Sequence, residues 1–435
     1  MTVKKQRLAL HWQILIAIAI AVVAGLLAGE DSAVFGVTFY SVFDFIGRLF
    51  LNALKMLIVP LIASSMIVGV AGIGSSESLG RLGGRTLFFY ATTGLAAIVL
   101  GLAVINLVKP GIIDGRPAGE MMALEAEGES VASLIGDRDA GDIVEIFIRM
   151  VPENVFSAAS DNGAILSIIF FSLLFGYFIT RIGPVHGQLL VSFWKAVFEV
   201  MTKMTEWVMT LAPIGVFGLV AKVVAKAGLS AAGPLALFAA CVLLVLAIHL
   251  VVTLPLFIRI VTGRSPWPLF PAMAPALLTA FSTASSSATV PVTLDCVENR
   301  AGVSNKISSF VIPLGATINM NGTALYECAA VIFIAQAYGV EMTLFTQFTV
   351  VFLALMTSIG VAGIPAASLV AIAIILTAVG LPPEAIGVLF VFDRILDMAR
   401  TAVNVAGDAT AAVIVASLEG ERTILQRSSG VTARG

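Results

Sequence analysis

The chain has 435 residues, of which 59% are hydrophobic and 12% are charged, and its mean hydropathy is +1.02. A soluble domain carries about 25% charged residues, so this composition excludes a soluble globular protein and predicts a chain that lies mostly in a bilayer. The net charge of −2 argues against a nucleic-acid partner, and the three cysteines and three histidines do not form a zinc-binding pattern.

Eight apolar stretches of bilayer length predict an all-α polytopic membrane protein. They lie near residues 10–29, 40–72, 84–109, 163–183, 190–224, 231–261, 305–338 and 384–418. Two more apolar segments, about 267–296 and 343–381, are interrupted by small and polar residues, which is typical of re-entrant hairpins. The order of hairpin and then span occurs twice, over 267–338 and 343–418, and predicts inverted repeats that meet at the binding site.

Basic residues in the connections predict that the N- and C-termini are cytoplasmic. They precede the first span or follow the second, sixth and last spans: Lys4, Lys5, Arg7, Arg81, Arg85, Arg259, Arg264, Arg422 and Arg427. Lys222 and Lys226 fall on the other side and depart from the rule. The acidic, glycine-containing connection at 110–142 favours a flexible extracellular loop. The basic N-terminus lacks a small-residue cleavage site, so we expect a retained first span and, without a targeting extension, a prokaryotic inner membrane.

Polar motifs interrupt the apolar sequence in the last third of the chain. They are the serine triplet Ser285–Ser287, the string Asn319–Thr323, the segment Ser358–Pro365 and the stretch Asp393–Arg400. Polar groups are costly in hydrocarbon and usually line a substrate or ion path, so these motifs predict a transporter. An intramembrane serine nucleophile is the enzyme alternative. The triplet has no lysine or histidine at a useful spacing, so we expect no enzymatic activity.

The last predicted helix carries five polar residues on one face. At 100° per residue, the arc that contains them spans roughly 80°. These residues are Asp393, Asp397, Arg400, Asn404 and Asp408. Such a stripe cannot face lipid. It indicates a binding site inside the protein, with a structural ion-pair ladder between helices as the alternative.

These motifs, in this order, resemble the glutamate transporter family, the dicarboxylate/amino acid:cation symporters. The resemblance rests on the string from Ser285 to Glu327, the glycine-rich second hairpin and the pattern Asp397-x-x-Arg400-x-x-x-Asn404-x-x-x-Asp408, and it extends to Lys55–Pro60. It implies a homotrimer of elevator-type transporters, in which a mobile transport domain moves against a scaffold domain. The implied scaffold comprises helices 1–2 (1–83) and helices 4–5 (143–226). The implied transport domain comprises helix 3 (84–109) and everything after the fifth helix (227–435), and the acidic loop (110–142) lies between helices 3 and 4.

The resemblance also implies which residues hold the substrate. Arg400 would bind its side-chain carboxylate in a bidentate contact, Asp397 its ammonium group and Asn404 its main-chain carboxylate. Gly360 and Gly363 fit a lid formed by the second hairpin, with a plain helix kink as the alternative. The remaining implied contacts come from both hairpins and the last two helices: Ser285, Ser286, Ser287, Thr323, Gly363 and Thr401. Because Asp397 and Arg400 would each need a partner in a dry site, they favour an acidic amino acid.

Two sodium sites are implied in the same way. One would be formed by Gly315, Asn319, Asn404 and Asp408. The second would be built from carbonyl groups at Thr317, Ser358, Ile359 and Val361. Unwound backbone carbonyls together with a carboxylate suit a hard cation. Sodium is thus a candidate coupling ion, and no cofactor is expected.

A third sodium site of the family is altered at two positions. Most members carry aspartate where this chain has Asn321 and a hydroxyl residue where it has Gly94, although Tyr90 and Thr93 are present. A carboxylate about 2.5 Å from a monovalent cation contributes roughly 6–7 kcal/mol at an effective dielectric of ~20, an upper bound that ignores desolvation. We therefore expect the third sodium to be absent.

Glu327 and Arg394 are two further positions at which the chain can be compared with the family that it resembles. Animal members carry glutamate at the position of Glu327 and would move a proton on it, whereas archaeal members carry glutamine. A carboxyl group in an apolar span can be carried neutral, which predicts proton coupling, with a structural helix–helix hydrogen bond as the alternative. Other members have an arginine at the place of Ala284 or of Met398. This chain has Arg394 instead, within i,i+3 reach of Asp397, and we expect it to hold Asp397 in the empty site.

The sequence therefore predicts a secondary active symporter of L-aspartate and/or L-glutamate, coupled to protons through Glu327, with room for sodium at one or two sites. A fully sodium-coupled aspartate/glutamate symporter and a C4-dicarboxylate symporter are the alternatives. The expected partners are the acidic substrate, the lipid bilayer and two further copies of the chain.

Overall fold

The computed structural model describes residues 10–71, 77–122, 124, 148, 150–160, 165–230, 232–360, 367–422 and 424–425. Most of these residues are helical. Two short antiparallel hairpins depart from the predicted all-α fold: β1 (Ala33–Val34) pairs with β2 (Val37–Thr38), and β3 (Ile112–Ile113) pairs with β4 (Arg116–Pro117). Most of the acidic loop predicted at 110–142 lies outside the described residues.

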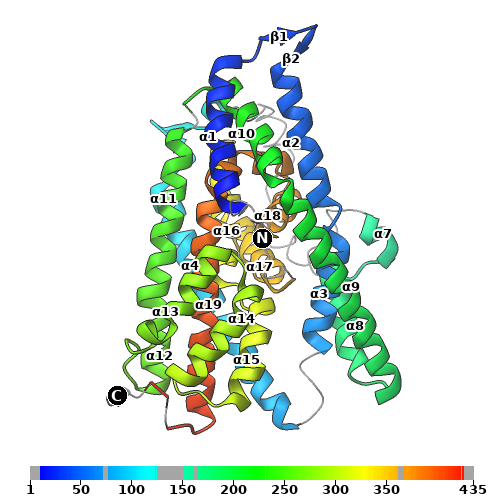
Figure 1. Ribbon diagram of the computed structural model, residues 1–435, viewed down its shortest axis with the longest axis vertical. Helices are drawn as coiled ribbons and strands as arrows, with labels where there is room; N and C mark the ends of the chain where they lie inside the picture. Colours follow the sequence, from blue (N-terminus) through cyan, green and yellow to red (C-terminus); the bar gives the residue numbers. More distant parts are fainter. Residues whose placement is uncertain are drawn as a thin grey trace, which may run out of the picture.

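A first set of helices comes from the beginning and the middle of the chain. Its members are α1 (Leu10–Ala28), α2 (Phe39–Lys55), α3 (Ile58–Ala71), α7 (Val155–Ser160), α8 (Ile165–Ile179), α9 (Pro184–Thr210) and α10 (Ala212–Ala227). α10 packs against α1 and α2, and α3 packs against α8 and α9 (Figure 1). Asp44 of α2 pairs at 2.7 Å with Lys222 of α10 and with Arg48 of its own helix, which adds a polar link between α2 and α10.

A second set contains the remaining long helices. Its members are α4 (Glu77–Val108), α11 (Ala232–Ile248), the π-helical turn η3 (His249–Thr253), α12 (Leu254–Thr262), α13 (Leu269–Thr283), α14 (Ser286–Asp295), the π-helical turn η4 (Cys296–Arg300), α15 (Asn305–Ile318), α16 (Asn321–Ala337), α17 (Leu344–Gly360), α18 (Ala367–Ala378), the 3₁₀ turn η5 (Pro383–Leu389) and α19 (Phe390–Leu418). A further 3₁₀ turn, η1 (Glu120–Met122), follows β4.

The helix α16 forms the centre of this second set. Every one of its residues is buried, and α4, α11, α17, α18 and α19 pack against it. A helix that is apolar on all sides must be covered on all sides, and the sequence of α16 has almost no polar face. Two polar residues of α16, Asn321 and Glu327, are consequently enclosed by protein.

Two of the four predicted interruptions are local breaks in the helices, whereas Asp393–Arg400 lies within the continuous helix α19 and most of Ser358–Pro365 lies outside the described residues. α13 ends at Ala284, which has a left-handed backbone with φ 51°, and Ser285 is extended and caps α14 by accepting a hydrogen bond from the Ala288 amide at 3.2 Å. α13 and α14 pack against each other as a helix pair, and so do α17 and α18. Asn319 and Met320 leave the helical region between α15 and α16, with φ −99° and −110°.

Within the described residues, five helices are long and apolar enough to cross a membrane: Phe39–Ala71, Arg81–Val108, Ala232–Thr262, Asn305–Ala337 and Pro383–Leu418. A sixth span results if Pro184–Thr210 and Ala212–Ala227, which bend by 54°, are counted as one. The spans predicted at 10–29 and 163–183 coincide with shorter apolar helices among the described residues. The fold is that of a polytopic helical membrane protein.

The C-terminal segment is fastened to the second set by polar contacts. The Arg264 guanidinium, which follows α12, donates to the carbonyl oxygens of Arg422 at 3.0 Å and of Ile424 at 2.5 Å. Glu419 pairs with Arg85 of α4 at 2.5 Å. The end of α19 is therefore held against α4 and α12.

Candidate functional site

The predicted stripe on α19 faces the protein interior, and Arg400 lies at its centre. The Arg400 side chain is 1% exposed, and its Nη2 donates to Asp397 Oδ1 at 2.9 Å and to Asp393 Oδ1 at 3.2 Å. Both carboxylates are buried as well. An arginine enclosed between two carboxylates avoids the large cost of an unpaired buried charge.

Arg400 also lies over an aromatic ring. Its guanidinium carbon is 3.9 Å from the centre of the Tyr326 ring of α16, a cation–π contact that fixes the plane of the guanidinium. Two of its nitrogens, Nε and Nη1, are buried without a hydrogen-bond partner among the described residues. Buried donors of this kind are normally satisfied, so these two N–H groups indicate where an additional acceptor would bind.

Arg394 extends the charged cluster beyond Asp397. Its Nη1 is 3.8 Å from Asp397 Oδ2, its side chain is buried, and its Nε has no hydrogen-bond partner among the described residues. The cluster then alternates in sign from Asp393 through Arg400 and Asp397 to Arg394, with no net charge. A cavity of about 20 Å³ adjoins it, walled on the other side by apolar residues such as Phe50 of α2, and this volume suffices for about one water molecule.

Asn404 connects α19 to the broken region between α15 and α16. Its Oδ1 accepts hydrogen bonds from the backbone amides of Gly322 at 2.8 Å and Thr323 at 3.4 Å, and its Nδ2 donates to Thr323 Oγ1 at 3.1 Å. Thr401 Oγ1 donates to the Asp397 carbonyl at 2.8 Å. The structure thus brings Asp397 into contact with Arg400, and Thr323 into contact with Asn404 one helical turn further along α19.

The serine triplet lies at the turn between α13 and α14, and α14 packs against α19. Ser286 is buried, Ser285 is half-buried and Ser287 is exposed. The turn exposes the first backbone amides of α14, which are suitable donors to a carboxylate. Ser285 Oγ already serves the amide of Ala288, so this hydroxyl shapes the turn.

Three of the four residues predicted for the first sodium site meet at one point. Asp408 Oδ1 accepts a hydrogen bond from Asn319 Nδ2 at 2.8 Å, and Asn319 Oδ1 is buried without a hydrogen-bond partner among the described residues. Gly315 lies so close that a Cβ atom at this position would collide with the Asp408 carboxylate and would lie 2.7 Å from the Tyr90 hydroxyl. A buried carboxylate beside an amide whose oxygen has no hydrogen-bond partner among the described residues fits a hard cation such as sodium.

The residues of the second predicted sodium site are described in part. Thr317 of α15 and Ser358 of α17 each donate their hydroxyl to a carbonyl of their own helix, at 3.0 Å and 2.9 Å, and the two helices pack against each other. The backbone of Ile359 belongs to α17, but its side chain, Val361 and Gly363 lie outside the described residues.

The two departures from the family's third sodium site face each other between α4 and α16. Asn321 Nδ2 donates to Thr93 Oγ1 at 3.1 Å. A Cβ atom added to Gly94 would lie 3.3 Å from Asn321 Oδ1. The neutral amide of Asn321 therefore occupies the position from which a carboxylate would contribute negative charge. At position 94, glycine leaves no side chain where a hydroxyl group would be.

Glu327 is fully buried on α16 and contacts the second helix pair. Its Oε2 accepts a hydrogen bond from Thr357 Oγ1 of α17 at 2.7 Å, and its Oε1 has no hydrogen-bond partner among the described residues. Neither Thr357 nor Tyr326 was identified from the sequence as a site residue. For Thr357 the available signal is a hydroxyl residue in an apolar helix next to a predicted hairpin tip.

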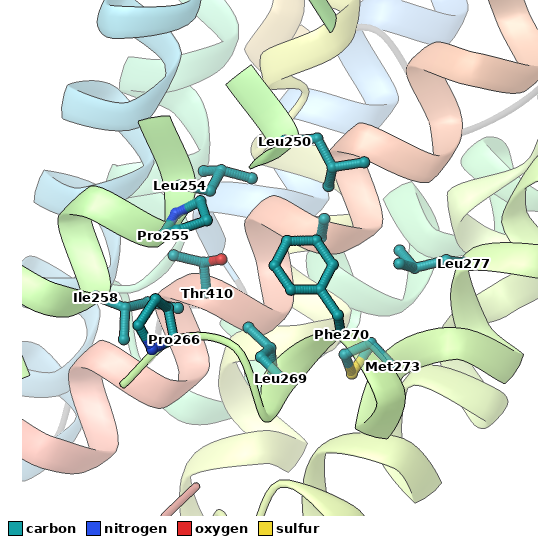
Figure 2. A pocket seen from close by; sticks show the side chains of 11 residues that line it. Leu250, Leu254, Pro255, Ile258, Pro266, Leu269, Phe270, Met273, Leu277 and Thr410 are labelled. Atoms are coloured by element: carbon teal, nitrogen blue, oxygen red, sulfur yellow. The ribbon is translucent and has the colours of Figure 1, made fainter. Parts of the chain in front are cut away.

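An apolar cavity lies apart from this charged cluster, between α12, α13 and α19. Figure 2 shows Leu250, Leu254, Phe270 and Met273 around it, with Thr410 as its polar residue. Its volume is about 20 Å³. Its lining offers no charged group to a charged substrate, whereas Asp393, Arg394 and Asp397 line the cavity beside the cluster, so the candidate site remains the cluster on α19.

Comparison with known proteins places the chain in a family. A model of the sodium:dicarboxylate symporter family matches residues 10–418. The chain is 34% identical over 417 residues to the proton/glutamate-aspartate symporter of Escherichia coli (strain K12), which covers 96% of this chain and 94% of that protein. It is 34% identical over 424 residues to the proton/sodium-glutamate symport protein of Geobacillus stearothermophilus, which covers 96% of each. It is 35% identical over 452 residues to excitatory amino acid transporter 3 of Mus musculus, which covers 94% and 86%.

These matches confirm the resemblance drawn from the motifs and exclude the enzyme alternative. The chain belongs to the sodium:dicarboxylate symporter family, whose members are transporters.

Proposed function

We propose that the protein is a secondary active symporter of acidic amino acids, L-aspartate and/or L-glutamate. The observation that carries this proposal is Arg400, which is buried against Asp393 and Asp397 and has two N–H nitrogens without a partner among the described residues. The names of the relatives, which include a glutamate-aspartate symporter, support the same substrate class.

The charges of the cluster match those of an acidic amino acid. The substrate's side-chain carboxylate would accept from the unpartnered Arg400 N–H groups, and its ammonium group would pair with Asp397. Its main-chain carboxylate would bind near Asn404, Thr323 and the α14 turn. A C4-dicarboxylate lacks the ammonium group and would direct a second carboxylate toward Asp397, which is electrostatically unfavourable.

Uptake into proteoliposomes tests this assignment. Labelled L-aspartate should accumulate, unlabelled L-aspartate or L-glutamate should compete, and succinate should compete far more weakly. Succinate that competes as well as L-aspartate would overturn the proposal in favour of a C4-dicarboxylate carrier. Arg394, which is not assigned a direct substrate contact, supplies a comparison: Arg394→Lys should retain uptake where Arg400→Lys strongly weakens it.

For the coupling ions we propose a proton carried on Glu327 and sodium at one or two sites, with the third sodium absent. The contact between Asp408, Asn319 and Gly315 supports the first sodium site. The Asn321 amide donating to Thr93 next to Gly94 supports the absence of the third, because a donor and a missing side chain replace two acceptors. Imposing sodium and proton gradients separately distinguishes this carrier from one that is fully sodium-coupled, which would not respond to a proton gradient alone.

For the architecture we propose eight spans, both termini in the cytoplasm and the cell inner membrane as location. The first set of helices would be the scaffold and the second set the transport domain, with α4 assigned to the latter from Glu77 onward. The preference of each set for packing within itself supports this division. Exposed apolar side chains along α9, such as Phe193 and Trp207, suit contact with lipid or with other copies in a homotrimer. Native mass spectrometry of the detergent-solubilised protein tests the trimer.

A further inference from the structure

The hydroxyl of Thr357 has two acceptors at short distance, and a third, the carbonyl oxygen of Ala354, lies 3.3 Å away. Its Oγ1 lies 2.7 Å from Glu327 Oε2 and 2.8 Å from the carbonyl oxygen of Leu353 in the preceding turn of α17. A threonine hydroxyl carries one hydrogen and can donate it to one acceptor well, while its oxygen can also accept. The direction of the bond to Glu327 therefore depends on whether Glu327 itself carries a proton.

The two protonation states of Glu327 require opposite arrangements. An ionised carboxylate can only accept, so Thr357 donates to it and gives up its bond to Leu353. A protonated carboxyl can donate to Thr357 Oγ1, and Thr357 is then free to donate to Leu353. The last turns of α17 thus differ in hydrogen bonding between the two states, just before residues 361–366, which connect α17 to α18.

The surroundings of Glu327 leave few other groups that could respond to its charge. Arg400 of α19 is the charged residue that acts on it, and Cys328 is the adjacent titratable group on its own helix. The described parts of α17 and α18 contain no ionisable side chain. On α4, Tyr90 faces Asp408 and donates to the Val311 carbonyl at 2.7 Å.

We propose that Thr357 is a positioning residue that transmits the protonation state of Glu327 to the second helix pair by reversing the direction of their hydrogen bond. This inference rests on the proposed proton coupling at Glu327. It assigns a role to a side chain that neither the motifs nor the comparisons identify. Ionised Glu327 holds α17 by a charge-assisted bond, whereas protonated Glu327 lets Thr357 restore its bond within α17.

The test replaces Thr357 by valine, which keeps the shape and removes the hydroxyl, with Thr357→Ser as the matched control. The initial rate of L-aspartate uptake is measured against pH. Losing a donor that favours ionised Glu327 should move the midpoint of the profile to higher pH by about one unit, because a hydrogen bond to a charged group is worth roughly one to two pH units. Thr357→Ser should keep the wild-type midpoint. A valine profile that superimposes on the wild type would overturn the proposal.

The same substitutions in the Glu327→Gln background separate this inference from the proposed coupling. If Glu327→Gln retains the wild-type pH dependence, proton coupling at Glu327 fails, and the role of Thr357 fails with it. If Glu327→Gln abolishes the pH dependence but Thr357→Val leaves the midpoint unchanged, only the role of Thr357 fails. A midpoint shift by Thr357→Val that persists with Gln at 327 would also overturn it. Thr357→Ala provides a second hydroxyl-free variant should the valine variant not fold, and it should give the same shift.

Discussion

Restoring the two altered positions between α4 and α16 should create a sodium site that the wild-type protein lacks. The variant combines Asn321→Asp with Gly94→Ser. A serine Cβ at position 94 would lie 3.3 Å from the side-chain oxygen at position 321, so its hydroxyl can reach the same cation as the new carboxylate and Thr93. The matched control combines Asn321→Asp with Gly94→Ala, which adds the same Cβ without the hydroxyl.

The expected gain is large enough to measure. At an effective dielectric of ~20, a carboxylate about 2.5 Å from sodium contributes roughly 6–7 kcal/mol before desolvation. If desolvation offsets about half of it, the remaining ~3 kcal/mol corresponds to roughly a hundredfold gain in sodium affinity. The number of sodium ions per substrate, obtained from reversal potentials in proteoliposomes, should rise by one. The thermal midpoint of the variant should also become more dependent on sodium than that of the wild type.

The control with alanine at position 94 should show a weaker gain, because it supplies the carboxylate but one ligand fewer. The reasoning is refuted if the wild-type protein already moves three sodium ions per substrate. It is equally refuted if the serine variant folds, binds substrate and shows neither a higher sodium stoichiometry nor a steeper dependence of stability on sodium.

Three further substitutions test the charged cluster and the proton site. Arg400→Lys should weaken L-aspartate uptake by about 10- to 100-fold, because an ammonium group replaces the guanidinium fork that can bind Asp393, Asp397 and a substrate carboxylate together. An unchanged KM for L-aspartate would contradict this. Glu327→Gln should give a flat pH profile of uptake in proteoliposomes, and unchanged pH dependence would remove Glu327 from the mechanism. Arg394→Gln should raise the KM for L-aspartate about 3- to 10-fold, because Asp397 then keeps Arg400 as its one cationic neighbour. The control Arg300→Gln, at an exposed position, should leave the KM unchanged. Equal KM values for the two variants would show that Arg394 does not position Asp397.

The features that could be predicted from the sequence are those determined by neighbouring residues. The turn at Ala284 and Ser285 and the break at Asn319 and Met320 are local conformations, and polar residues in an apolar run identify them directly. The stripe on α19 follows from helical periodicity alone. The Asp114-Gly115 pair in the β3–β4 turn is also a local hairpin signal, which a search for membrane spans does not use.

The partners across helices could not be predicted in this way. Tyr326 lies under Arg400 although 74 residues separate them, and Thr357 meets Glu327 across 30 residues, because the rotation and axial position of packed helices decide both contacts. The contact between positions 94 and 321 could not be predicted either, because in the sequence each position shows only a substitution relative to the family.

The fastening of the C-terminal segment determines what a reporter group attached there would measure. Arg264 holds the carbonyls of Arg422 and Ile424, and Arg85 holds Glu419, so this end of the chain is anchored to α12 and α4. If the second set is the mobile transport domain proposed above, a fluorophore joined after Leu425 would accompany it during transport. A partner dye on the exposed face of α9 would stay with the first set. Energy transfer between the two dyes would then follow each transport cycle in single molecules without any change to the binding site.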